Sequence, residues 1–202
     1  MGTKERILAT ALELYNSQGI HAITSRHIAA KMAISPGNLH YHFKHTDDII
    51  HTLYKQLAAE FDVIMEEVGG AGKADLQLFY DYSHRSFELV YKYRFILLNF
   101  VEIGLRIPAI KKHYHTLTER RSTQFKVLFK QLQSGNIFRS DLPESVWETL
   151  VIQIFIVADF WLSNNELTVK LKGQQAVSYY NAVFQQMFYP YLTPVAVKKM
   201  MK

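Results

Sequence analysis

The side chains best suited to chemistry lie between positions 25 and 44. Asn38, His40 and Tyr41 stand close together there, on what the sequence predicts to be a short helix. An asparagine amide can form two hydrogen bonds with an adenine edge, and histidine and tyrosine can reach bases or phosphates. Arg26 and Lys44 flank these residues and supply cations for phosphate contacts. This combination indicates recognition of a nucleic acid.

Two short helices joined by a tight turn would hold these side chains in place. Ser35 is suited to cap the second helix, and Pro36 to its first position, where the missing N–H costs no hydrogen bond. Ala33 falls in the turn, where glycine is usual because the backbone takes a positive φ, and alanine there costs about 1 kcal/mol. The apolar residues between the two helices are Ile28, Ala29, Met32, Ile34 and Leu39. The pattern favours a helix-turn-helix whose second helix enters the major groove; a helical hairpin inside a plain bundle is the alternative.

Backbone groups add to the expected contacts with DNA. Pro36 and Gly37 keep the first turn of the second helix slim, so that its backbone can approach the duplex closely. Helices beginning at Thr24 or Ser25, and at Thr46, present free N–H groups to phosphates. With the side chains named above, these five residues complete the predicted contact set.

Helical periodicity runs through almost all of the 202 residues, so we expect an all-α fold. Five prolines and nine glycines leave few breaks, and the clearest linker-like one spans residues 69–72. Thr3 is the expected cap of the first helix. A short helix is expected to begin at residue 36. The other helices are expected over residues 25–32, 46–68, 75–104, 108–132, 143–163 and 173–189. We divide the chain into a three-helix DNA-binding domain (1–48) and a larger helical effector-binding and dimerisation domain (49–202).

The composition argues against several kinds of chemistry. The chain has no cysteine, which excludes disulfides, thiolate metal sites and a cysteine nucleophile. The histidine pairs at positions 40 and 42 and at 113 and 115 are two residues apart, so they point to different sides of a helix and no metal site is expected. The sequence contains no phosphate-binding glycine loop, nucleophile elbow or zinc-protease motif. We therefore expect no enzyme, no catalytic residue and no cofactor.

The net charge of +5 is unevenly distributed. Residues 1–50 carry five basic and four acidic residues, which gives +1, whereas residues 92–130 carry nine and two, which gives +7. The basic excess thus lies away from the expected DNA contacts. The first residues do not resemble a signal peptide, and the most apolar run, 150–162, is too short for a bilayer. We expect a cytoplasmic protein without a membrane partner.

Residues 19–49 resemble the DNA-binding segment of TetR/AcrR-type transcriptional regulators. Matches to the family pattern are Gly19, Thr24, Ile28, Ala29, Ser35, Gly37, Leu39, His42, Phe43, Asp47 and Ile49. The sequence departs from the pattern at three places, where Met32-Ala33 replaces Ala-Gly, His40 replaces Tyr, and His45-Thr46 replaces a pair that ends in lysine. The resemblance implies a homodimer and an effector pocket in the second domain.

The resemblance also implies that the last two long helices form the dimer. The apolar residues expected at that interface are Val151, Ile154, Phe155, Val177, Tyr180, Phe184 and Phe188. Polar residues in apolar surroundings are the candidates for the effector pocket: His84, Asn99, Glu102 and Asp159. For each of these four, a structural hydrogen bond is the alternative role.

These observations predict a homodimeric transcriptional regulator, expected to be a repressor. It would bind a palindromic operator and be released by a small, partly apolar effector. The competing hypothesis is a helical ligand carrier or protein-interaction module that does not bind DNA. The two hypotheses differ in whether Asn38, His40 and Tyr41 are exposed together on the third helix.

Overall fold

The computed structural model describes residues 2–70 and 75–200. Within these ranges every regular element is a helix, and the only extended pairing is an isolated bridge between Phe138 and Leu192. The predicted all-α fold is confirmed. In chain order the elements are α1 (Thr3–Gln18), α2 (Ser25–Lys31), α3 (Pro36–His42), α4 (Thr46–Gly70), α5 (Leu76–Lys92), α6 (Arg94–Leu98), α7 (Phe100–Arg106), α8 (Pro108–Ser134), α9 (Glu144–Leu167), α10 (Gln174–Gln186), the 3₁₀ helix η1 (Tyr189–Tyr191) and α11 (Pro194–Met200).

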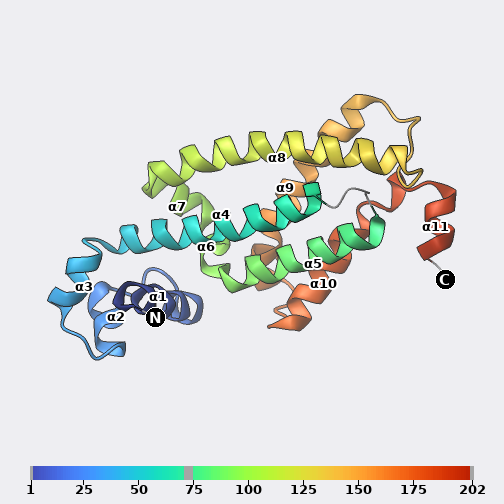
Figure 1. The fold of residues 1–202 in the computed structure, drawn as a ribbon. Helices are drawn as coiled ribbons and strands as arrows, with labels where there is room; N and C mark the ends of the chain where they lie inside the picture. Colours follow the sequence, from blue (N-terminus) through green and yellow to red (C-terminus); the bar gives the residue numbers. More distant parts are fainter. Residues whose placement is uncertain (1, 71–74, 201–202) are drawn as a thin grey trace.

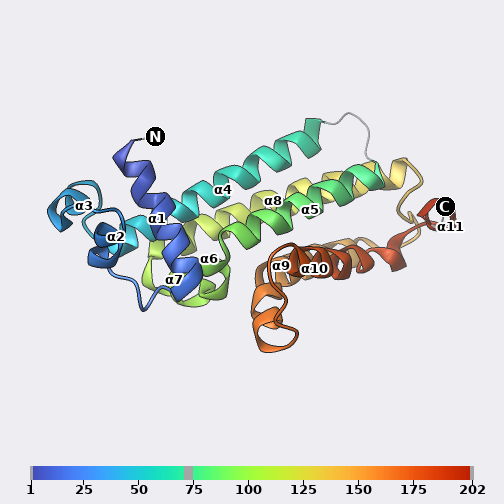
Figure 2. The ribbon, with the colours of Figure 1, turned by 90° about the horizontal axis from the view of Figure 1, so that it is seen from below.

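The molecule is elongated, with a small head at one end of a larger body (Figures 1 and 2). Helices α1, α2 and α3 form the head together with the start of α4, and the chain ends at the opposite end of the body. The head packs around fully buried aliphatic side chains, among them Ile7, Ile28, Leu39 and Ile49. Contacts of α1 with α4 and α6 join the head to the body.

Helix α4 belongs to both parts of the molecule. Ile49 and Ile50 near its beginning are buried with the head, and Ile64 near its other end is buried in the body, where α4 packs against α5 and α8. The expected domain boundary after residue 48 falls inside this continuous helix of 25 residues. The two parts are therefore connected by a rigid element.

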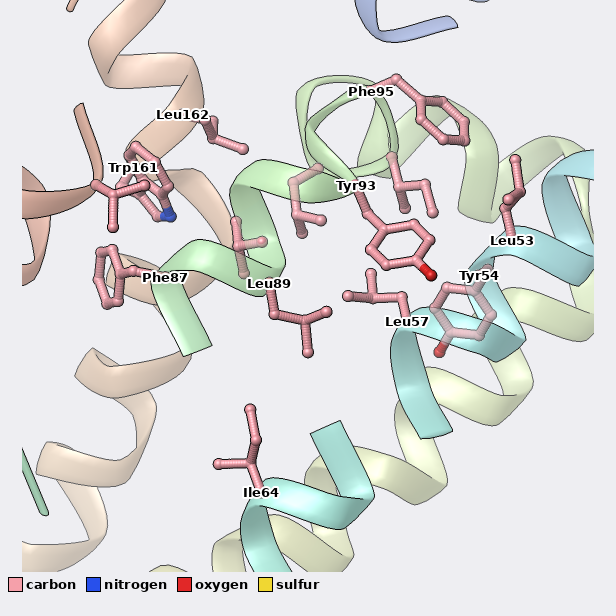
Figure 3. Packing of buried hydrophobic residues seen from close by; sticks show 14 of the residues in the cluster. Leu53, Tyr54, Leu57, Ile64, Phe87, Leu89, Tyr93, Phe95, Trp161 and Leu162 are labelled. Atoms are coloured by element: carbon pink, nitrogen blue, oxygen red, sulfur yellow. The ribbon is translucent and has the colours of Figure 1, made fainter. Parts of the chain in front are cut away.

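The body is held together by a mixed aliphatic and aromatic core (Figure 3). Leu53 and Leu57 on α4 lie near Tyr93, which follows α5. Earlier on α5, the Phe87 ring stacks on Trp161 of α9, with 5.3 Å between the ring centroids. This stacking anchors α9 to α5.

Several expected element boundaries were wrong. The stretch 75–104 is three helices, because the backbone leaves helical geometry at Tyr93 and again at Asn99. Asn99 donates a side-chain hydrogen bond of 2.7 Å to the carbonyl oxygen of Phe95, which stabilises that joint. Helix α1 begins with Thr3 as its first residue, and its cap is Gly2 in an extended conformation. The expected break at residues 69–72 lies partly within α4 and partly outside the described residues.

The C-terminal helices also differ from expectation. Helix α9 is longer than predicted, and by length and composition it is the one described helix that could cross a membrane. It packs against α6, α8 and α10, and Trp147, Leu150 and Trp161 are buried on that side. The stretch expected over 173–189 divides into α10 and η1, and α11 begins at Pro194.

Candidate nucleic-acid interface and ligand cavity

The turn between α2 and α3 is closed by backbone hydrogen bonds. The N–H of Ala33 donates to the carbonyl oxygen of Ala30, and the N–H of Ile34 donates to that of Ala29, each at 3.1 Å. This pair of bonds is a Schellman motif, which needs a left-handed residue at its centre. Ala33 takes that position with a φ of 54°, as the sequence predicted.

Side-chain caps fix both helix starts. The Thr24 hydroxyl accepts a hydrogen bond of 3.4 Å from the backbone N–H of His27 at the start of α2. The Ser35 hydroxyl accepts one of 3.1 Å from the backbone N–H of Asn38, and Pro36 occupies the first position of α3. These caps orient α2 and α3 independently of any partner.

Helix α3 lies at the free end of the head (Figure 1). Asn38, His40 and Tyr41 are all exposed, and Tyr41 is 81% exposed despite its large ring. Leu39 and Phe43 face the opposite way and are buried. The observation that separates the two functional hypotheses therefore favours DNA binding.

The other predicted DNA contacts surround this helix. Arg26 and Lys44 are exposed, as are Pro36, Gly37 and Thr24. Ser25 and Thr46 are partly buried at the beginnings of α2 and α4.

Two family models match the chain. One, described as "Bacterial regulatory proteins, tetR family", covers residues 7–53, and the other, described as "Bacterial transcriptional repressor" and named TetR, covers residues 45–200. The chain belongs to the TetR family of bacterial transcriptional regulators. The helix-turn-helix is thus the DNA-binding unit of this family.

Individual TetR-family proteins are similar to the chain over most of its length. The HTH-type transcriptional regulator QacR of Staphylococcus aureus is 24% identical over 139 residues, which are 68% of this chain and 72% of QacR. A TetR-family regulator from Marinobacter aquaeolei superposes with a TM-score of 0.88 at 25% identity, covering 100% of this chain and 96% of that one. A putative regulator from Saccharomonospora viridis in complex with choline gives a TM-score of 0.70 at 19% identity, over 94% and 96% of the two chains.

The body of this TetR-family chain contains a cavity of about 150 Å³. Helices α4, α5, α8, α9 and α10 all contribute to its wall. Most of the wall is apolar, and eight of its residues are aromatic: Phe61, Phe79, Tyr82, Phe87, Tyr114, Phe125, Phe155 and Phe184. The charged residues in the wall are Asp159 and Arg121.

Asp159 is the one predicted pocket residue that lines this cavity. The other three do not line this cavity, and each has a hydrogen-bond or ion-pair partner elsewhere. His84 lies between α5 and α10 beside Gln174 and Asn181, and Asn99 holds the joint between α6 and α7. Glu102 is exposed and paired with His21 and Arg106.

The Asp159 carboxylate accepts a hydrogen bond from the Tyr114 hydroxyl. Burial raises the pKa of Asp159 to about 6, although the Tyr114 hydrogen bond opposes this rise. Burial also lowers the pKa of Arg121, while the neighbouring Asp62 counteracts that effect. Arg121 is ion-paired with Asp62 and donates a 2.7 Å hydrogen bond to Gln124. Of the two charged groups in the wall, Arg121 thus has an ion-pair partner, whereas Asp159 has only a neutral hydrogen-bond partner.

Polar contacts connect the head with the body. The Asn16 side chain at the end of α1 donates to the carbonyl oxygen of Lys92 at 2.8 Å and accepts from the N–H of Phe95 at 3.1 Å. From α7, Glu102 reaches His21 at 3.0 Å and Arg106 reaches Asp47 at 3.2 Å. These contacts join the head to α6, to α7 and to the end of α5, which is one of the cavity helices.

The residues expected at the dimer interface lie mostly inside the single chain, and their role in a dimer stays a prediction. Phe155 is partly buried in the cavity wall, and the other six are at most 6% exposed: Val151, Ile154, Val177, Tyr180, Phe184 and Phe188. The same two helices carry large apolar side chains that are 44–59% exposed in the single chain: Ile152, Ile156, Phe160, Tyr179 and Val183. We call these five residues the apolar stripe.

Sequence reasoning missed Tyr114, Arg121 and Asn16. The first two lie on α8 among many other polar residues, and the composition of this helix is that of a solvated one. A buried arginine gives no signal there, because surface arginines occur at the same helical spacing. Asn16 precedes the expected end of α1, and an asparagine near a helix end is usually explained by local capping.

Proposed function

We propose that the chain is a DNA-binding repressor that acts as a homodimer on a palindromic operator. The observation that carries this proposal is the joint exposure of Asn38, His40 and Tyr41 on α3 at the free end of the head. A recognition helix must offer polar side chains without hindrance from the rest of the molecule. Membership of the TetR family supports this proposal over a ligand carrier or protein-interaction module, and it supports a role other than catalysis.

The dimer would form through the apolar stripe on α9 and α10. Monomeric soluble proteins rarely expose contiguous large apolar side chains without a partner. A two-fold interface there would place two copies of α3 on successive half-sites of one face of the duplex. This arrangement also supports a cytoplasmic protein, because the apolar surface of α9 would be covered by a second copy.

We infer that the cavity binds a small effector that lowers operator affinity. Tyr114 connects the cavity to α7. Its hydroxyl donates a hydrogen bond to Asp159, and its ring packs edge-to-face on Phe100 of α7 with 4.7 Å between the ring centroids. Helix α7 in turn carries Glu102 and Arg106, whose ion pairs reach the head. In this proposal, residues 1–48 read DNA and residues 49–202 bind the effector and the second copy.

The test is selection of bound sequences from a random duplex library at a fixed salt concentration. The proposal predicts an enriched inverted repeat and a steep fall of affinity with salt, because phosphate contacts release counterions. A control protein with Asn38→Ala and Tyr41→Ala should enrich no repeat. Recovery of only unrelated sequences by the unmodified chain would contradict operator recognition.

A further inference from the structure

Asp159 is a carboxylate placed where no cation of the protein balances it. It lies on α9 in the wall of the cavity, and its partner is the neutral hydroxyl of Tyr114. No lysine, arginine or histidine of the described residues lies within ion-pair distance of it. A carboxylate in an apolar surrounding needs a compensating partner, and a bound ligand can supply one.

The other charge of the wall is already balanced. Arg121 is ion-paired with Asp62 on α4, which also pairs with Arg120 at 2.6 Å. Glu66, one turn farther along α4, adds a second negative charge near Arg121. Two carboxylates thus face two guanidinium groups, which leaves Asp159 as the unbalanced charge.

The remainder of the wall suits an organic cation. Tyr114 and Phe155 are cavity-lining aromatic residues close to Asp159, the first by its hydrogen bond and the second one turn earlier on α9. The faces of aromatic rings attract ammonium groups, most strongly where water is excluded. A volume of about 150 Å³ is comparable to cavities that hold one benzene-sized ring.

We propose that the cavity binds a small organic cation, with its ammonium group at Asp159 and its apolar body among the aromatic rings. This inference rests on the proposed function of the cavity as an effector site and specifies the chemical class of the effector. An anionic effector would be repelled by the carboxylate of Asp159, and a neutral effector would leave the charge of that carboxylate without a compensating cation.

Three probes of the same shape test the charge preference. Phenethylamine is a cation at neutral pH, phenethyl alcohol is neutral, and phenylacetate is an anion. Calorimetric titration of the purified chain should give an affinity for the amine at least about tenfold above that for the alcohol, and weaker binding of phenylacetate. Equal affinity for amine and alcohol, tighter binding of phenylacetate, or no binding of any probe overturns the proposal.

The variant Asp159→Asn locates the preference. It keeps the size of the side chain and should reduce the ratio of amine to alcohol affinity to about one, with little change for the alcohol. The matched control is Asp81→Asn, which alters an exposed carboxylate of α5 that bonds Gln77 and lies outside the cavity wall. A preference that survives Asp159→Asn places the cation elsewhere and overturns the assignment.

A measurement on the unmodified chain covers the case in which Asp159→Asn does not fold. Because burial raises the pKa of Asp159 to about 6, lowering the pH through this value neutralises the carboxylate. The amine-to-alcohol ratio should then fall. The other titratable groups near Asp159 are Tyr114, Arg121 and Tyr54, whose hydroxyl contacts His113. Burial raises the pKa of both tyrosines, so they stay neutral across this pH range. A ratio that does not change with pH contradicts the proposal.

The same samples separate this inference from the proposed function. If the amine binds through Asp159 but operator affinity is unchanged, the ligand class stands and the effector role fails. If operator binding is intact and no probe binds, the ligand class fails and the DNA-binding role stands.

Discussion

The Arg106 Nε atom lies 3.2 Å from Asp47 Oδ1, which ties α7 of the body to the first turn of α4 in the head. Arg106 also pairs with Glu102 at 3.2 Å, and Glu102 reaches His21 at 3.0 Å. All four side chains are substantially exposed, so each pair contributes little to stability, typically below about 1 kcal/mol. We interpret their role as positional, because they fix how the head sits on the body.

The variant Arg106→Gln tests this interpretation. Its melting temperature should change little, whereas the factor by which a bound ligand weakens operator binding should decrease. The measurement is the affinity of a ligand with and without operator DNA. Arg139→Gln is the matched control, because Arg139 forms an exposed ion pair with Asp141 away from the head. An unchanged coupling factor would remove Arg106 from the connection.

Asn38→Ala should relax the sequence preference of the protein and weaken operator binding by about 1–3 kcal/mol, if the amide pairs with a base. Arg26→Ala should weaken binding to all sequences alike and reduce the salt slope by about one unit. Fluorescence anisotropy at several salt concentrations measures both effects. A fully retained preference in Asn38→Ala would show that Asn38 does not read a base.

Ile156→Glu should dissociate the dimer while leaving the fold intact. Ile156 is 56% exposed in the single chain, so its charge becomes buried only in a dimer. Phe184→Glu, by contrast, puts a charge into the core of the chain and should unfold it, because Phe184 is 6% exposed. Light scattering and circular dichroism distinguish the two results. A full-strength dimer of Ile156→Glu would place the interface elsewhere.

Ala33→Gly should stabilise the head. The left-handed conformation of Ala33 carries about 1 kcal/mol of strain that glycine avoids, and the greater flexibility of unfolded glycine offsets part of this gain. The expected net stabilisation is about 0.5 kcal/mol in urea unfolding. Ala30→Gly, in the last turn of α2 and next to its end at Lys31, is the control and should destabilise by up to about 1 kcal/mol. Equal effects of the two variants would contradict the assigned strain.

The stability of the chain should depend on the ionisation of Asp159. The folded pKa, about 6, lies above the unfolded value of 3.8, so folding favours the protonated carboxyl. This contribution is complete below the unfolded pKa and is lost as the pH rises through the folded one, a loss of at most about 3 kcal/mol. Asp159→Asn should therefore stabilise the chain more at pH about 8 than at pH about 4, measured by urea unfolding. The same gain at both values, or the same pH dependence in Asp81→Asn, would contradict this origin.

The head could be predicted from sequence because its determinants are local. Caps at Thr24 and Ser35, the turn at Ala33 and the exposure of Asn38 all follow from spacing within one short segment. Helical geometry then decides which side chains face outward. No contact with a distant part of the chain is needed for this inference.

The body could be predicted only as a class, because its details depend on contacts between distant segments. Helix α9 is apolar on nearly all sides. The periodicity of its sequence therefore cannot tell which face packs against the body and which face meets a second copy. Glu102 has apolar neighbours in sequence, but on α7 it faces outward toward His21. The cavity residue Arg121 becomes recognisable only once α4 brings Asp62 beside it.

Asp159 and Phe160 are consecutive residues of α9, yet one lines the cavity and the other belongs to the apolar stripe. A ligand at Asp159 therefore acts on the same turn of helix that a second copy of the chain would contact. If the ligand binds monomer and dimer with different affinities, ligand binding and self-association are thermodynamically linked, and each changes the equilibrium constant of the other by the same factor. The apparent ligand affinity would vary with protein concentration, and the response of the regulator would depend on how many copies the cell contains.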